Sequence, residues 1–327
     1  MTDLTGSERA GGPGGRRRRR RGPRPDPLLL AEDEGGPDMG DWRPGLPGAA
    51  AAPVFRSPPP RPTLLRGALT MLGLIYHATV RDVRKGHRNA AAGLLLNILQ
   101  TVIFIATFYL MFWLLGVSGN RVRGDFLLYL MSGIFLFMIH TKAVGAIVRA
   151  EGPTSPMMQH APLNTTITMA ASALSALYLQ VLSMMVILGL YHVLWTPLEI
   201  EEPMGAIGMV LVAWISGVGV GICFAALRPW YPEFTSVGSS IYSRANMVAS
   251  GKMFVANSLP ASMLPIFDWN PLFHAIDQAR GYVFLNYSPH FSSWPYALWV
   301  AFALIVIGLM GEAYTRRHAS LSWSAGR

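Results

Sequence analysis

Long apolar segments separated by short polar stretches dominate the chain from residue 92 onwards. An α-helix needs about 20 apolar residues to cross roughly 30 Å of hydrocarbon, and five of these segments reach or approach that length. The last of them begins with Trp294, Tyr296 and Trp299, residue types that are typical of the membrane–water interface. The pattern predicts transmembrane helices over residues 92–115, 126–148, 167–195, 206–227 and 294–310.

The segment over residues 236–289 is also largely apolar, but charged residues, glycine and proline interrupt it. We expect a full fifth span there, followed by a broken or re-entrant helical hairpin before the last span. Non-helical backbone at membrane depth is tolerated only where it is buried in protein or lines a wet cavity, so the interruption hints at a pathway. The predicted fold is an all-α membrane protein with six transmembrane helices. The interrupting residues are Arg244, Gly251, Lys252, Pro260, Pro265 and Pro271.

A different pattern covers residues 62–88, where leucine and isoleucine recur at helical spacing and basic residues close the segment. This pattern is typical of an amphipathic helix that lies in the membrane interface. We expect this N-terminal interface helix to belong to a transmembrane domain over residues 62–318, followed by a short cytoplasmic tail over residues 319–327. The apolar residues are Leu64, Leu65, Leu69, Leu72 and Ile75, and the basic ones are Arg81, Arg84, Lys85 and Arg88.

Composition supports a membrane protein, because 51% of the residues are hydrophobic and only 14% are charged. A soluble globular domain has about 25% charged residues. The net charge of +9 does not indicate nucleic-acid binding, because the bases gather in the run Arg16–Arg21 and just before the first span. Residues 1–61 are low-complexity and are expected to form a disordered cytoplasmic tail. Its arginines either touch anionic lipid headgroups or only fix the topology.

The orientation follows from charge, because Lys and Arg are enriched on cytoplasmic flanks. The segment before the first span is basic, and Arg316 and Arg317 follow the last span. An even number of spans places both termini in the cytoplasm and puts the acidic loop with Glu199, Glu201 and Glu202 outside. We therefore expect a multi-pass protein of the bacterial inner membrane.

No catalytic or energy-coupling motif stands out. The nearest approach to a phosphate-binding loop, Ser250-Gly251-Lys252-Met253, lacks the upstream glycine and the hydroxyl residue that holds magnesium. A single cysteine, Cys223, excludes an intramolecular disulfide and a multi-cysteine metal site. The chain is therefore expected to be no enzyme and to bind no cofactor or metal of its own.

Two kinds of unusual residue lie inside the predicted spans. Lys142 either snorkels to the cytoplasmic interface or faces a cavity, and His140 is expected to be a hydrogen-bonded interior residue. Gly217 and Gly221 have the four-residue spacing that lets helices approach closely. This spacing predicts packing, either between two spans or between two subunits.

Aromatic residues crowd the first span, and Phe104, Phe108 and Phe112 share one helix face. Most stripes of this kind serve in packing or face lipid. A sharper hypothesis is a stacking track for sugar rings, whose apolar faces lie well on aromatic planes. The candidate substrate-channel residues are Phe104, Phe108, Tyr109, Phe112 and Trp113.

The stretch from Asp268 to Arg280 carries a family resemblance. It resembles the "W-N-P-hydrophobic-x-H" segment, followed by an acidic-to-arginine helix, of ABC exporter permeases of the polysaccharide-export type. Ser250-Gly251 with Pro260, and the "Y-L-x-x-G" of Tyr129 to Gly133, resemble two further parts of that family's pattern. The resemblance spans about residues 64–318. It implies an exit-side motif of Trp269, Asn270, Pro271, His274, Asp277 and Arg280.

The resemblance also implies partners. Two copies would form the channel, and separate cytoplasmic ATPase subunits would hold ATP and Mg²⁺. Periplasmic or outer-membrane polysaccharide export proteins and membrane lipid are further expected partners, and nucleic acid is not. The ATPase would dock on a coupling segment that contains Met157, Met158, Gln159, His160 and Pro162.

The implied function is export of capsular polysaccharide, O-antigen or a related glycan. One alternative is an ABC permease for a drug or a lipid. Alternatives of another class are a secondary transporter and a membrane-embedded transferase. A secondary transporter is expected to have paired broken helices and carboxylates within its spans, whereas we find one broken region and no such carboxylate.

Overall fold

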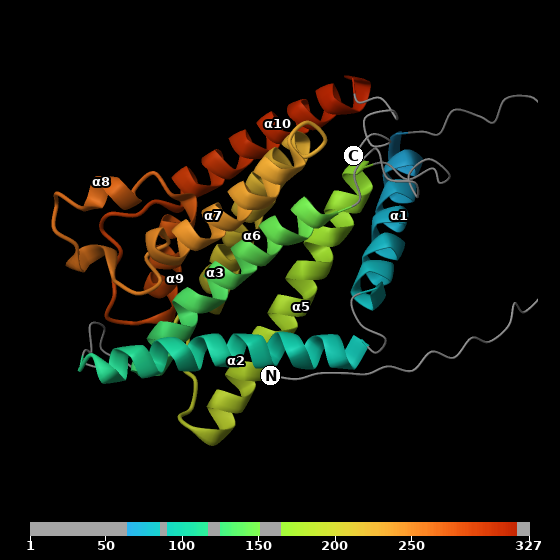
Figure 1. Cartoon of the computed structure of the whole chain (residues 1–327). Helices are drawn as coiled ribbons and strands as arrows, with labels where there is room; N and C mark the ends of the chain where they lie inside the picture. Colours follow the sequence, from blue (N-terminus) through green and yellow to red (C-terminus); the bar gives the residue numbers. More distant parts are fainter. Residues whose placement is uncertain (1–63, 86–89, 117–124, 151–164, 319–327) are drawn as a thin grey trace, which may run out of the picture. The chain divides into compact units, whose positions relative to one another are not determined.

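The computed structural model describes residues 64–85, 90–116, 125–150 and 165–318. Within these ranges all regular structure is helical, which confirms the predicted all-α class. Five helices in the described part are long and apolar enough to cross a membrane, and the bounds of the first four follow the predicted spans closely, whereas the last extends eight residues further. They are α2 (Ala90–Leu114), α3 (Phe126–Arg149), α5 (Thr165–Leu194), α6 (Pro203–Leu227) and α10 (Trp294–His318) (Figure 1).

The place of the expected fifth span is taken by α7 (Pro232–Ala249). This helix has 18 residues, or about 27 Å at 1.5 Å per residue, but its serines make it more polar than the other five. The broken helical segment expected before the last span follows α7. It consists of the 3₁₀ turn η1 (Ala256–Ser258) and the helices α8 (Leu264–Phe267) and α9 (Pro271–Val283).

The predicted N-terminal amphipathic helix is α1 (Leu64–Lys85), and it packs along α5. Its buried side places Ala78 against Ile167 and Ala171 of α5. On its other side Leu69 is exposed. The division into a packed side and an exposed apolar side is what an interface helix needs.

The helix α6 packs most extensively against α10 and α3, and it also contacts α9 (Figure 1). Small residues permit this close approach. A Cβ added to Gly217 would lie 2.6 Å from the backbone oxygen of His140 in α3, and one added to Gly221 would lie 3.0 Å from Ile147 Cβ. The glycine spacing therefore joins two spans of one chain, which answers the question that the sequence left open.

The same helix supplies a matched pair of substitutions. We expect Gly217→Ala to lower the free energy of unfolding by about 1–3 kcal/mol, because the new methyl group meets backbone rather than a side chain that is able to move. Gly208→Ala is the control, since within the described residues no atom lies within 4 Å of a Cβ built there. Thermal unfolding of both variants in detergent measures the difference, and equal melting temperatures would contradict the close packing of α3 on α6.

A buried histidine ties α7 to the rest of the bundle. His140 of α3 is fully buried, and its Nδ1 lies 2.9 Å from Ser216 Oγ of α6. Its Nε2 lies 2.9 Å from the hydroxyl of Tyr242 in α7. His140 is thus the hydrogen-bonded interior residue that we expected.

Candidate functional site

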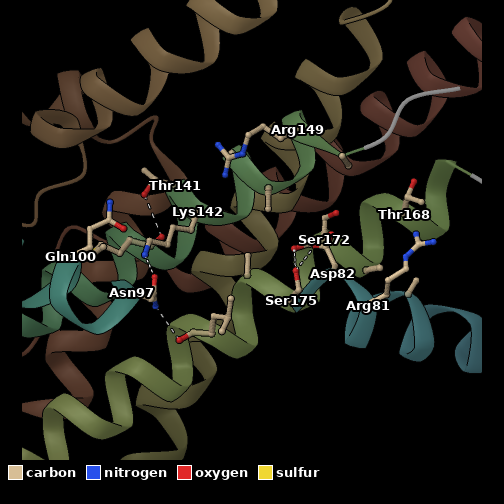
Figure 2. A pocket seen from close by; sticks show the side chains of 18 of the residues that line it. Arg81, Asp82, Asn97, Gln100, Thr141, Lys142, Arg149, Thr168, Ser172 and Ser175 are labelled. Atoms are coloured by element: carbon tan, nitrogen blue, oxygen red, sulfur yellow. Dashed lines mark hydrogen bonds between the residues drawn. The ribbon is translucent and has the colours of Figure 1, made fainter. Parts of the chain in front are cut away.

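A cavity of about 780 Å³ lies between α1, α2, α3 and α5, near the end of the bundle where α3 finishes and α5 begins. Half of its 20 lining residues have polar or charged side chains. Figure 2 shows these side chains projecting from all four helices toward the same space. Because three of the four surrounding helices, α2, α3 and α5, are apolar enough to cross a membrane, a polar interior of this size marks the cavity as the candidate site.

Lys142 stands at the centre of the polar lining. Its ammonium donates a hydrogen bond to Asn97 Oδ1, which joins α3 to α2 (Figure 2). The Asn97 amide in turn donates to Ser183 Oγ (2.6 Å) and to the carbonyl of Leu179 (3.1 Å) in α5. The sequence left two possibilities for Lys142, a side chain that snorkels to the interface and one that faces a cavity. The structure supports the second.

The charges around the cavity are unequal. Arg81, Lys142 and Arg149 line it together with one acid, Asp82. The Asp82 carboxylate accepts a hydrogen bond from Ser175 Oγ at 2.8 Å, which ties α1 to α5. Three bases against one acid leave an excess of two positive charges, so the cavity attracts anions.

The five aromatic residues of the predicted sugar-stacking track lie in different environments in the structure. Phe104 lines the cavity, where its ring stacks on that of Phe137 with centroids 5.8 Å apart. Phe108 and Phe112 are buried in the core instead, and Tyr109 and Trp113 are exposed. One of the five candidate channel residues thus reaches this cavity.

Behind the Phe104–Phe137 ring pair lies Lys252, which appeared in the sequence as an interruption of an apolar segment and as part of an incomplete phosphate-binding loop. Its side chain is fully buried. Its ammonium sits 3.7 Å from the ring centre of Phe137 and 4.5 Å from those of Phe104 and Phe108. The only signal available in the sequence was a lysine within an apolar stretch, which does not say what surrounds it.

The first half of the predicted exit-side motif shapes the start of α9. Asn270 caps the helix, since its Oδ1 accepts from the backbone N–H of Leu272, and Pro271 is the first helical residue. The Asn270 amide donates to Asn246 Oδ1 (2.8 Å) and to the carbonyl of Ala249 (3.0 Å), which holds the end of α7. Trp269 is largely exposed.

His274 links α9 to the segments on either side of it. The Ser293 N–H donates to His274 Nδ1 at 3.1 Å, so Nε2 carries the proton and donates to the carbonyl of Asp268 at 2.7 Å. The ring also packs edge-on against Tyr296 at the start of α10. His274 thus fastens the broken segment to the last span.

Asp277 and Arg280 lie three residues apart on α9, a spacing that permits an ion pair on one helix face. They do not pair with one another. Arg280 donates to the carbonyls of Gly251 (3.0 Å), Lys252 (2.6 Å) and Phe254 (2.6 Å). Its guanidinium also lies 4.2 Å from the ring centre of Tyr129. The cause is that three carbonyl oxygens of the loop after α7 surround the guanidinium, and its charged N–H groups satisfy them all.

The Asp277 carboxylate has its own partners. It accepts hydrogen bonds from the hydroxyls of Tyr287 and Ser292, the latter at 2.7 Å. Burial and the adjacent carboxylate raise the pKa of Tyr287, so its phenol stays a donor. Asp277 and Arg280 therefore hold the two sides of the broken segment, one the loop after α9 and the other the loop after α7.

The coupling residues Met157, Met158, Gln159, His160 and Pro162 lie outside the described residues, as do residues 1–61. In the part of the chain that is described, no group of three or more His, Cys, Asp or Glu side chains is placed to hold a metal ion.

Comparison with known proteins gives one positive result. The family model described as "ABC-2 type transporter" matches residues 74–284, which include the second half of α1 and all of α2, α3, α5, α6, α7, α8 and α9. Among curated proteins, no significant match is found. The matched range contains every residue that lines the cavity and also the exit-side motif.

Proposed function

Because the chain belongs to the ABC-2 type transporter family, we propose that it is the channel-forming permease subunit of an exporter for capsular polysaccharide or a related glycan. Membership makes the chain a transport subunit, a multi-pass membrane protein and one part of an ABC system with an ATPase partner. The glycan and the inner bacterial membrane belong to the proposal.

The polar cavity is the observation that carries the proposal. Its walls present amides at Asn97 and Gln100 and hydroxyls at Thr141, Thr168 and Ser172. Such groups both donate and accept hydrogen bonds, which suits a cargo rich in hydroxyl groups. The rings of Phe104 and Phe137 offer an aromatic surface for a sugar ring.

The remaining features of the proposal concern the assembly. Two copies of the chain form the channel, and two ATPase subunits with ATP and Mg²⁺ dock on the side of the coupling segment. Both termini lie in the cytoplasm. Periplasmic or outer-membrane export proteins receive the cargo on the other side. ATP-driven closure of the ATPases shifts the channel between inward-facing and outward-facing states.

A lipid is the second candidate cargo, and one observation favours it. An apolar cavity of about 990 Å³ lies between α1, α5 and α6, and Leu72, Leu177 and Leu211 are among its lining residues. Its shape and character suit an acyl chain. Arg84 borders it and is able to bind a phosphate headgroup.

The test is deletion of the chain in its native host, followed by measurement of glycan at the cell surface and inside the cell. We expect surface glycan to fall to background and intracellular glycan to accumulate, because synthesis continues while export stops. Re-expression of the chain restores export only when the partner ATPase is able to hydrolyse ATP. Unchanged surface glycan together with an altered lipid composition would instead support the lipid permease.

A further inference from the structure

The buried ammonium of Lys252 calls for an explanation. None of its surface is exposed, and no described residue accepts a hydrogen bond from it. Three phenylalanine rings supply cation–π contacts, which offset only part of the cost of removing a charge from water. A methionine would fill the same space at a lower cost, so the charge itself has a role outside this resting arrangement.

The position of the ammonium indicates that role. Phe104 and Phe137, two of the three rings around it, also line the polar cavity. The stacked ring pair is therefore a wall between the cavity and Lys252. Displacement of either ring would open the cavity toward the ammonium. Lys142 of α3 and Asn97 of α2 line the same cavity.

The backbone of Lys252 is held firmly. Arg280 binds its carbonyl at 2.6 Å, and a Cβ added to Gly133 of α3 would come within 2.9 Å of Lys252 Cα. Because the backbone is anchored against α3, opening of the wall requires movement of side chains or of α2 rather than of the Lys252 loop. The ammonium thus keeps its place while the rings around it move.

We propose that Lys252 binds an anionic group of the exported molecule, a carboxylate or a phosphate, once the Phe104–Phe137 wall opens. The inference rests on the proposed function, and it adds the chemical class of the cargo. The excess positive charge of Arg81, Lys142 and Arg149 draws the anion into the cavity. Lys252 then receives it beyond the wall, and the rings close around the ammonium again when the anion leaves.

The experiment compares Lys252→Met, Lys252→Arg and Arg244→Gln in the full chain, expressed in the deletion strain with its native ATPase. Arg244 is an exposed base on α7, so its variant removes one positive charge away from the cavity. The readouts are the surface glycan, the melting temperature of each purified variant, and the chemical composition of the cargo. We expect Lys252→Met to reduce export about tenfold, which matches the loss of one charge-assisted hydrogen bond.

Lys252→Arg is expected to retain export, and Arg244→Gln to match the wild type. The melting temperature of Lys252→Met should equal or exceed that of the wild type, since an unpaired buried charge has been removed. A purely structural lysine would show the opposite, a lower melting temperature with export falling in parallel. Full export by Lys252→Met overturns the inference.

Cargo analysis distinguishes the sources of the anion and separates this inference from the proposed function. Uronic acids or phosphates in the repeating unit place the anion along the glycan, whereas a neutral repeat on a phosphorylated lipid places it at the lipid linkage. A cargo without any acidic group overturns the inference but leaves glycan export intact. A deletion strain with normal surface glycan overturns the proposed function itself, and this inference with it.

Discussion

Arg280→Ala is expected to prevent the protein from folding stably. The substitution removes a donor from the carbonyls of Gly251, Lys252 and Phe254 at once. The Gly251 carbonyl keeps the backbone N–H of Phe254 as a second donor at 3.3 Å, so the loss falls on the carbonyls of Lys252 and Phe254. Each buried carbonyl left without a donor costs about 1–3 kcal/mol, and the lost contact with the Tyr129 ring adds about 0.5–2 kcal/mol. The sum takes a large part of a typical free energy of unfolding of about 5–15 kcal/mol.

The measurement is size-exclusion chromatography and thermal unfolding in detergent. Arg280→Lys is expected to be intermediate, because a single ammonium keeps the charge but lacks the planar fork that reaches three carbonyls. Arg244→Ala serves as the control, since Arg244 is exposed on α7. An Arg280→Ala protein that elutes as a single peak and melts like the wild type would show that the loop after α7 needs no such clamp.

The helices were predictable because their signal is local. Apolar runs of span length are required in a membrane whatever packs around them, so α2, α3, α5 and α6 begin and end within three residues of expectation. The last helix is the exception, because α10 continues to His318 rather than stopping at residue 310. Glu312 ends the apolar run, yet it is buried within the helix. Backbone hydrogen bonding, not apolarity, decides where a helix ends.

The site was less predictable, because it depends on which helix faces meet. Helical spacing put Phe104, Phe108 and Phe112 on one face, but it does not reveal that Lys252 inserts among the rings of Phe104 and Phe108. Spacing likewise placed Asp277 near Arg280. The carbonyls and hydroxyls that actually bind these side chains come from loops 10 to 29 residues away. Partners so far apart in the chain produce no periodic sequence pattern from which they could be predicted.

Lys142 illustrates the same limit of prediction from sequence, because two interpretations of it were possible. A lysine about two turns from the end of a span has a long side chain that reaches either the interface or a cavity. Sequence gives the depth of the residue in the helix but not the neighbour at that depth. Asn97 distinguishes the two possibilities, since its side-chain oxygen accepts a hydrogen bond from the Lys142 ammonium.

Lys142→Met is therefore expected to reduce export roughly 10- to 100-fold, the range that corresponds to losing a charged hydrogen bond of about 1.5–3 kcal/mol. Methionine retains much of the volume of the side chain, so the packing of α2 on α3 survives. The substitution removes the charge at the centre of the polar lining and frees the Asn97 side-chain oxygen. Surface glycan in the complemented deletion strain measures the effect.

Two comparisons separate the charge of Lys142 from its packing. Lys142→Arg keeps the charge and is expected to export at a rate closer to the wild type, while Asn97→Leu removes the acceptor and breaks the link to Ser183 and Leu179 as well. If the cavity is the path of the cargo, Lys142→Met folds normally and exports poorly. If Lys142→Met exports at the wild-type rate, the cargo passes elsewhere, and the surface between two copies of the chain becomes the place to search.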